Sequence, residues 1–99
     1  MKIVKNSIDE LEYRIGHDGE IEIVDIKVMS NRRQGIGTEM FKDLLSLNPK
    51  TVYAFTREIN GIGIEFYRAL GFREIFLPNF YIEGNAIMVI YENRSYRKI

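Results

Sequence analysis

A glycine-containing segment, Arg32-Arg33-Gln34-Gly35-Ile36-Gly37-Thr38, lies where a predicted strand gives way to a predicted helix. Bare N–H groups at a helix start, reinforced by the helix dipole, bind an anion if no Cβ atom blocks its approach. The segment therefore suits a phosphate group, although its spacing fits a plain glycine turn equally well. Two nucleotide motifs do not fit, because no Gly-Lys-Ser/Thr follows the spacer and Met40 stands where a third glycine is needed.

The chain before this segment predicts a β-hairpin. From Glu10 to Ile15 polar and apolar residues alternate, which is the period of a strand with one buried face. A turn, Gly16-His17-Asp18-Gly19, and a second strand, Glu20 to Met29, follow it. Ser7 and Glu10 also fit a capping box, so a short helix is the competing prediction.

The second strand contains a change of phase. Ile21 and Ile23 share one phase, whereas Val24, Ile26 and Val28 share the other. A strand that must keep one face buried absorbs such a slip with a β-bulge, and bulges bend strands near active sites. A strand buried on both faces would give the same pattern, and this alternative stays open.

Beyond the glycine segment, the pattern predicts two helices and three strands. The first helix has an apolar stripe that begins at Ile36, and it ends at Asn48-Pro49. The second helix is capped by Asn60 and ended by Gly71. The predicted strands are Val52 to Thr56, Phe72 to Leu77 and Ala86 to Tyr91, with a break at Pro78-Asn79 after the second of them.

These elements predict the fold class. The strand Val52 to Thr56 is reached from the bulged strand through a helix, and such a crossover makes the two strands parallel. The sequence therefore predicts an α/β fold with a mixed sheet. The polar and basic tail, Asn93 to Ile99, is predicted to be a frayed end.

Length and composition limit the class of protein. A chain of 99 residues with 45% hydrophobic and 28% charged residues predicts one soluble globular domain, residues 1–99. Its 14 basic and 14 acidic side chains cancel, so nucleic acid and anionic membranes are not expected partners. The sequence has no cysteine, which excludes disulfides and the common zinc sites, and no metal is expected. The absence of an apolar leader or spanning stretch predicts a cytoplasmic protein.

Two blocks of the sequence resemble the GNAT N-acetyltransferase superfamily. Arg32-x-x-Gly35-x-Gly37, preceded by a strand ending Ile26-Lys27-Val28, looks like the loop whose amides bind the pyrophosphate of acetyl-CoA in that family. The block from Asn60 to Phe72 resembles the next motif: an Asn, a small residue three positions on, an aromatic pair ending in Tyr, and Leu-Gly-Phe. The resemblance covers about Glu20 to Tyr91. It implies a minimal GNAT fold with a splayed parallel strand pair and two main helices.

The resemblance also implies a binding site for acetyl-CoA. Ile26 and Val28 would offer main-chain groups to the pantetheine arm. The amides expected to meet the phosphates are those of Arg33, Gln34, Gly35, Ile36, Gly37 and Thr38. Arg32, Arg33 and Arg68 could meet CoA phosphates through their planar donors, although an ordinary surface position fits Arg68 equally well. Asn60 is a helix cap, a contact to the CoA arm, or both.

Transfer of an acetyl group requires an acid and a base. Tyr67 matches the family's general acid, since a phenol that titrates near pH ~10 keeps its proton at neutral pH and can donate it to the leaving sulfur. A core aromatic next to Phe66 is the competing interpretation. Glu22 and Asp25 are the candidate bases, directly or through water, although charges on such a strand are more often solvated or paired. His17 is a weaker candidate.

Together these features predict an N-acetyltransferase that uses acetyl-CoA and an amine acceptor without an acyl-enzyme. A non-catalytic acyl-CoA-binding module is the alternative. Only a short segment precedes the bulged strand, where longer family members carry a first strand and two helices beside the acceptor. We therefore expect an acceptor site that is open to a large substrate such as a protein, or that a partner subunit completes in a homodimer.

Overall fold

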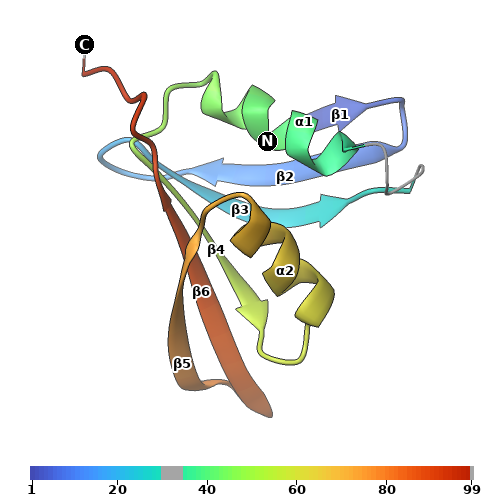
Figure 1. The fold of residues 1–99 in the computed structure, drawn as a ribbon, viewed down its shortest axis with the longest axis vertical. Coiled ribbons are helices and arrows are strands. Elements are labelled where there is room, and N and C mark those ends of the chain that lie inside the picture. The colour runs from blue at the N-terminus through green and yellow to red at the C-terminus, as the bar shows by residue number, and fades with distance from the viewer. Residues whose placement is uncertain (30–34, 99) are drawn as a thin grey trace.

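The computed structural model describes residues 1–29 and 35–98 and has a mixed sheet with both helices on one face (Figure 1). The sheet has six strands in the order β1-β2-β3-β4-β6-β5. The strands are β1 (Lys2–Lys5), β2 (Asp9–Ile15), β3 (Glu20–Lys27), β4 (Thr51–Arg57), β5 (Arg73–Tyr81) and β6 (Gly84–Glu92), and the helices are α1 (Ile36–Leu45) and α2 (Gly61–Ala69). The predicted α/β fold class is confirmed.

The predicted hairpin is confirmed, and it is preceded by a strand that the sequence did not reveal. β2 pairs antiparallel with β3, and β1 pairs with β2 through Asn6 and Ser7, both of which have positive φ angles, 54° and 64°. These two residues form a turn, so the capping-box alternative is wrong. In β1 the two apolar residues, Ile3 and Val4, are adjacent between two lysines, so no alternation of polar and apolar residues indicates a strand.

The phase change in β3 is a β-bulge. Glu12 of β2 faces Asp25, whereas the next residue, Tyr13, faces Ile23, so Val24 is the extra residue. Ile23 is 2% exposed and Val24 is 40% exposed, which excludes a strand buried on both faces. Beyond the bulge, Ile26 packs against the same core as Ile23. One inserted residue therefore keeps a single face of β3 buried.

β3 and β4 are parallel but pair for only part of their length. Glu20, Ile21 and Glu22 pair with Thr51, Val52 and Tyr53, respectively, and no further pairs follow. From that point the two strands spread apart as the arms of a V (Figure 1). β4 stays paired with β6 along its whole length, and β3 stays paired with β2 as far as Lys27, so the sheet separates between β3 and β4.

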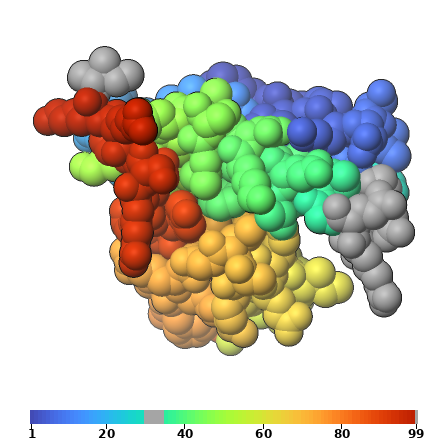
Figure 2. Space-filling view, turned by 45° about the horizontal axis from the view of Figure 1, so that its top comes forward, coloured from blue at the N-terminus to red at the C-terminus, as the bar shows by residue number. Residues whose placement is uncertain are grey.

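The hydrophobic core lies between this sheet and the two helices. Met40 and Leu44 of α1 are fully buried, and Phe41 packs against Phe72 and Tyr91 with ring centroids 5.3 and 5.1 Å apart. In the space-filling view, the green atoms of α1 lie directly against the gold atoms of the α2 region (Figure 2). Within the described residues, no helix has the length and apolar character needed to cross a lipid bilayer.

The opposite face of the sheet has no helix among residues 1–29 and 35–98 (Figure 1). Tyr53 and Phe55 of β4 alternate with the buried Val52 and Ala54 and therefore lie on this face. Phe80 stacks on Phe55 at a centroid distance of 4.9 Å and remains 48% exposed. This aromatic face borders the splayed part of the sheet.

Two predictions near the C-terminus need correction. Pro78-Asn79 does not end its strand: pairing with β6 is interrupted between Leu77 and Tyr81 and then resumes, with Asn79 at a φ of 55°. The tail is not a frayed end over residues 93–97. Asn93 is 9% exposed and donates from Nδ2 to the carbonyl oxygen of Pro49 at 2.7 Å. The tail is held because its polar groups bond to loop carbonyls.

Candidate active site

A cleft of about 540 Å³ occupies the gap between the splayed strands. Its walls come from β3 with Val28 after it, the end of β4, the first turn of α1, and α2 with its cap Asn60. The lining residues are Ile23, Val24, Asp25, Ile26, Val28, Gly37, Phe55, Thr56, Asn60, Ile62, Gly63, Phe66 and Tyr67. The structure thus brings together six residues that the sequence predicted for the site: Asp25, Ile26, Val28, Gly37, Asn60 and Tyr67.

The cleft passes between the two faces of the sheet. Phe55 lines it from the helix-free face, whereas Thr56 and Tyr67 line it from the helix side. Residues 25–27 of β3 use their other edge to pair with β2, so the edge that faces the cleft has no strand beside it. A strand edge of this kind can form hydrogen bonds with an extended ligand.

The glycines at the start of α1 serve two different purposes. Gly35 is the N-cap with a φ of 73°, and a Cβ added to it would meet no atom of the described residues within 4 Å. Gly35 is therefore needed for its backbone conformation and leaves open space beside the helix start. A Cβ on Gly37 would lie 2.9 Å from Cε1 of Phe66, so this glycine allows α2 to approach α1 closely. Ile36 is buried and Thr38 half-buried in the same turn.

Three predicted residues, Arg32, Arg33 and Gln34, lie outside the described residues. Their expected contacts with the phosphates of CoA stay predictions. The same holds for the expected phosphate contacts of the amides from Gly35 to Thr38, whose positions at the start of α1 are described.

Tyr67 projects from α2 into the cleft and is 8% exposed. Its ring packs edge-on against Phe66 and Phe72, with centroid distances of 5.4 and 5.0 Å. Among the residues that the structure describes, none forms a hydrogen bond with its hydroxyl. Burial raises the pKa of Tyr67 above its ordinary value, and the nearby Asp25 carboxylate raises it further. The phenol therefore keeps its proton at neutral pH, and that proton is available to a ligand.

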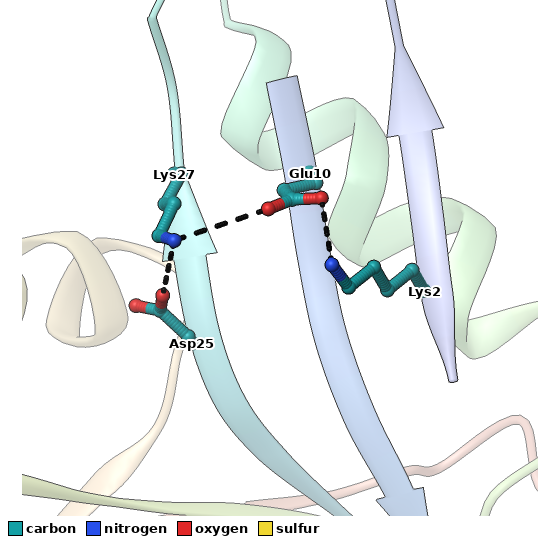
Figure 3. Close-up of polar contacts among 4 residues, drawn as sticks. All are labelled: Lys2, Glu10, Asp25 and Lys27. Carbon is teal, nitrogen blue, oxygen red and sulfur yellow. Dashed lines mark ion pairs between the residues drawn. The ribbon is translucent and has the colours of Figure 1, made fainter. Parts of the chain in front are cut away.

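The two candidate bases occupy different places. Asp25 lines the cleft, and its carboxylate lies 3.7 Å from Nζ of Lys27. Lys27 also approaches Glu10 at 4.0 Å, on the side of the strands turned away from α1 (Figure 3). Glu22 does not line the cleft and pairs with Arg14 at 3.4 Å. The geometry therefore favours Asp25 over Glu22 for contact with a bound molecule.

Asn60 caps α2 and also borders the cleft. Its Oδ1 accepts the backbone N–H of Gly63 at 3.1 Å, and its Nδ2 donates to Oγ1 of Thr56 at 3.1 Å. A Cβ on Gly63 would lie only 2.5 Å from Nδ2 of Asn60. The small residue three positions after the Asn is therefore required by the cap itself.

Arg68 lies apart from these residues. It forms a two-pronged ion pair with Glu74, with distances of 2.8 and 3.0 Å, and it does not line the cleft. To contact a CoA phosphate as predicted, Arg68 would have to leave Glu74 or bind Glu74 and the phosphate at the same time.

The sequence did not single out two buried polar residues, one that lines the cleft and one beside the end of β3. Thr56 lines the cleft and is 7% exposed. The sequence did contain a sign of its importance, because Thr56 alternates in phase with Val52 and Ala54 and a hydroxyl on the buried face of a strand needs a hydrogen-bond partner. Asp9 is fully buried, and its carboxylate accepts the backbone N–H of Met29 at 2.6 Å. Asp9 thereby extends the bonding between β2 and β3 to the last described residue before the glycine segment.

Comparisons with known proteins identify this arrangement as the GNAT acetyltransferase fold. Ard1 from Thermoplasma volcanium is 27% identical, with a TM-score of 0.74 over 86% of this chain and 62% of that chain. A GNAT family acetyltransferase from Elizabethkingia anophelis with acetyl-CoA bound is 20% identical, with a TM-score of 0.76 over 91% of this chain and 72% of that chain. Arabidopsis thaliana NAA60 in complex with a bisubstrate analogue is 18% identical, with a TM-score of 0.73 over 86% and 64%.

The likeness is one of structure. No family model and no curated protein sequence matches the chain. The chain spans less than two thirds of the length of Ard1 and of NAA60, at 62% and 64%. The expected GNAT fold, with its splayed parallel pair and two helices, is confirmed.

Proposed function

We propose that the protein is an N-acetyltransferase that transfers the acetyl group of acetyl-CoA directly to an amine acceptor. The observation that carries the proposal is the cleft between β3 and β4. It combines an unpaired strand edge for an extended amide chain, a helix start with an open glycine for phosphates, and a buried phenol that keeps its proton. Neighbours of the same fold, including the Elizabethkingia protein, contain acetyl-CoA.

In this proposal the pantetheine arm lies along the free edge of β3 at Ile26 and Val28. The pyrophosphate lies against the first amides of α1, where the helix dipole favours negative charge. Such an arrangement would place the thioester deeper in the V, towards Tyr67. The backbone does most of the binding, which is why few charged side chains line the cleft.

The reaction moves three protons, because the acceptor nitrogen loses two and the departing thiolate gains one. The acceptor enters as an ammonium ion and loses a proton to Asp25, directly or through water, so that its nitrogen can attack the thioester carbonyl. As the carbon–sulfur bond breaks, Tyr67 donates its proton to the departing thiolate. The former amine nitrogen, which became cationic on attack, gives its second proton to the Tyr67 phenolate or to solvent, and this completes the amide. Asp25 also favours the approach of a cation, since it is the charged residue among those that line the cleft.

We further propose that the acceptor enters from the helix-free face of the sheet. Phe55 and Val24 line the cleft on that side, and both are at least partly exposed. An approach without a covering helix suits a large acceptor such as the end of a protein chain. A second copy of the chain could instead complete this face.

Isothermal titration with acetyl-CoA tests the proposal. Wild-type protein should bind one equivalent, and Gly35→Val should bind much more weakly, because a β-branched residue strains a position with a φ of 73°. Gly61→Ala is the matched control, since a Cβ there meets no atom within 4 Å. Absence of saturable binding by the wild type would overturn the proposal. Binding without release of free thiol across a panel of amines and peptides would instead support a non-catalytic acyl-CoA-binding module.

A further inference from the structure

Thr56 is a polar side chain of the cleft to which the proposed reaction gives no role. It is the second-last residue of β4 and shares the core-facing phase of Val52 and Ala54. Only 7% of its surface is exposed, yet it lines the cleft. Burying a hydroxyl costs free energy unless its oxygen accepts a hydrogen bond and its proton donates one.

The hydrogen bonds around Thr56 have a defined direction. The backbone N–H of Gly63 can only donate, so the atom of Asn60 that faces it at 3.1 Å must be the amide oxygen. The amide nitrogen of Asn60 then faces Thr56, again at 3.1 Å. Because that nitrogen can only donate, the hydroxyl oxygen of Thr56 accepts, and its own proton is left for another partner.

No acceptor for that proton exists among the described residues. The structure gives Thr56 no side-chain hydrogen bond other than the one from Asn60, and the oxygen is not an orphaned buried atom. Thr56 lines the cleft, so its proton is available to a molecule that fills the cleft. A molecule bound there must present a hydrogen-bond acceptor at this point.

The position of Thr56 in the V indicates which part of a donor it meets. Pairing between the strands ends at Glu22 and Tyr53; Thr56 lies three residues further along β4, and Asp25 lies three residues further along β3. Thr56 therefore lies across the cleft from the start of the free edge of β3. An extended amide chain that pairs with β3 on one side turns its remaining carbonyl groups towards β4.

We infer that Thr56 is a binding residue for the acyl donor, and that its hydroxyl donates a hydrogen bond to an amide carbonyl of the pantetheine arm. This inference rests on the proposed function. It gives β4 a specific part in donor binding, opposite the backbone contacts of β3. It also gives the Asn60 cap a second effect, because the amide nitrogen of Asn60 turns the Thr56 proton into the cleft.

Titrations of CoA and acetyl-CoA against two variants test the inference. Thr56→Val keeps the shape of the side chain without the hydroxyl, and Thr56→Ser keeps the hydroxyl. We expect Thr56→Val to bind both ligands roughly five- to tenfold more weakly, the loss expected for one neutral hydrogen bond. Thr56→Ser should stay within about twofold of the wild type. The melting temperature of each variant, measured without ligand, confirms that the folded protein is being titrated.

The outcomes separate the roles of Thr56. Equal losses for CoA and acetyl-CoA in Thr56→Val, restored in Thr56→Ser, would support the inference. A loss confined to acetyl-CoA would place the hydroxyl on the thioester carbonyl and overturn it, as would unchanged affinity in Thr56→Val. Equal losses in both variants, together with lower melting temperatures, would mean a purely structural role. If the wild type itself bound neither CoA nor acetyl-CoA, the proposed function would be wrong, and this outcome differs from a loss of binding in Thr56→Val alone.

Discussion

At the scale of single residues, Tyr67 is a buried side chain whose hydroxyl is bonded to no described residue. Its removal should therefore affect chemistry more than stability. For Tyr67→Phe we expect the turnover rate to fall by about 10²-fold or more, the usual contribution of a positioned acid. The Michaelis constant for acetyl-CoA should change little. Release of free thiol at saturating acetyl-CoA measures the effect.

Tyr91→Phe is the matched control for this prediction. Tyr91 packs against Phe41 and Phe72 in the same aromatic group, but it does not line the cleft. Its loss should leave turnover within about twofold of the wild type. Similar rates for Tyr67→Phe and Tyr91→Phe would remove Tyr67 from the reaction.

The burial of Tyr67 also predicts a dependence of stability on pH. Its pKa is raised in the folded protein, whereas the phenol of the unfolded chain titrates near ~10. Above about pH 10 the folded state thus binds more protons, and the free energy of unfolding falls as the pH rises. This contribution is fully present at lower pH. Urea unfolding from about pH 9 to about pH 11 should show a smaller decline for Tyr67→Phe than for the wild type, and parallel declines would contradict it.

At the scale of elements, the first turn of α2 contains two glycines, of which one has room for a side chain and the other does not. A Cβ on Gly61 meets open space, whereas one on Gly63 would lie 2.5 Å from Nδ2 of Asn60. Gly61→Ala should raise the free energy of unfolding by about 0.5–1 kcal/mol through helix propensity. Gly63→Ala should lower it by about 1 kcal/mol because the cap is displaced. Chemical denaturation of both variants measures the difference, and equal effects would refute the described cap.

The sequence predicted elements well where a local pattern carries the information. Two phases within one strand indicated the bulge at Val24, and Asn60 indicated a cap because its partner lies three residues on. β1 was missed because its polar and apolar residues do not alternate. Asp9 was missed because the bond of its carboxylate to Met29 joins residues that are 20 positions apart. The proton of Thr56 could be assigned only once the orientation of the Asn60 amide was known.

At the scale of the whole molecule, the closed end of the V is held by bonds from the C-terminal tail. Asn93 binds Pro49, and Asn48 exchanges two hydrogen bonds with Arg97, at 2.7 and 2.9 Å. In the same loop, Lys50 donates its backbone N–H to the carbonyl oxygen of Gly19 at 2.7 Å. These contacts join the turn before β3 to the loop before β4, so the two strands start together.

Removal of the Asn93 side chain tests the importance of this tie. Asn93→Ala should lower the free energy of unfolding by about 1–3 kcal/mol, because it leaves the buried carbonyl of Pro49 without its donor. The neighbouring Arg94 is exposed, and Arg94→Ala should change stability by less than about 0.5 kcal/mol. Thermal unfolding of the two variants gives the comparison; a neutral Asn93→Ala would mean that the tail is dispensable.

The splay of β3 from β4 has a consequence for the protein in storage and in the cell. It creates a strand edge in the middle of the sheet, and an unoccupied edge can recruit a strand of another molecule. Acetyl-CoA bound along β3 would cover that edge. We therefore expect light scattering of the concentrated protein to rise more slowly with saturating acetyl-CoA than without it, and identical aggregation rates would contradict this. If the proposed function holds, the substrate would also protect the protein against aggregation.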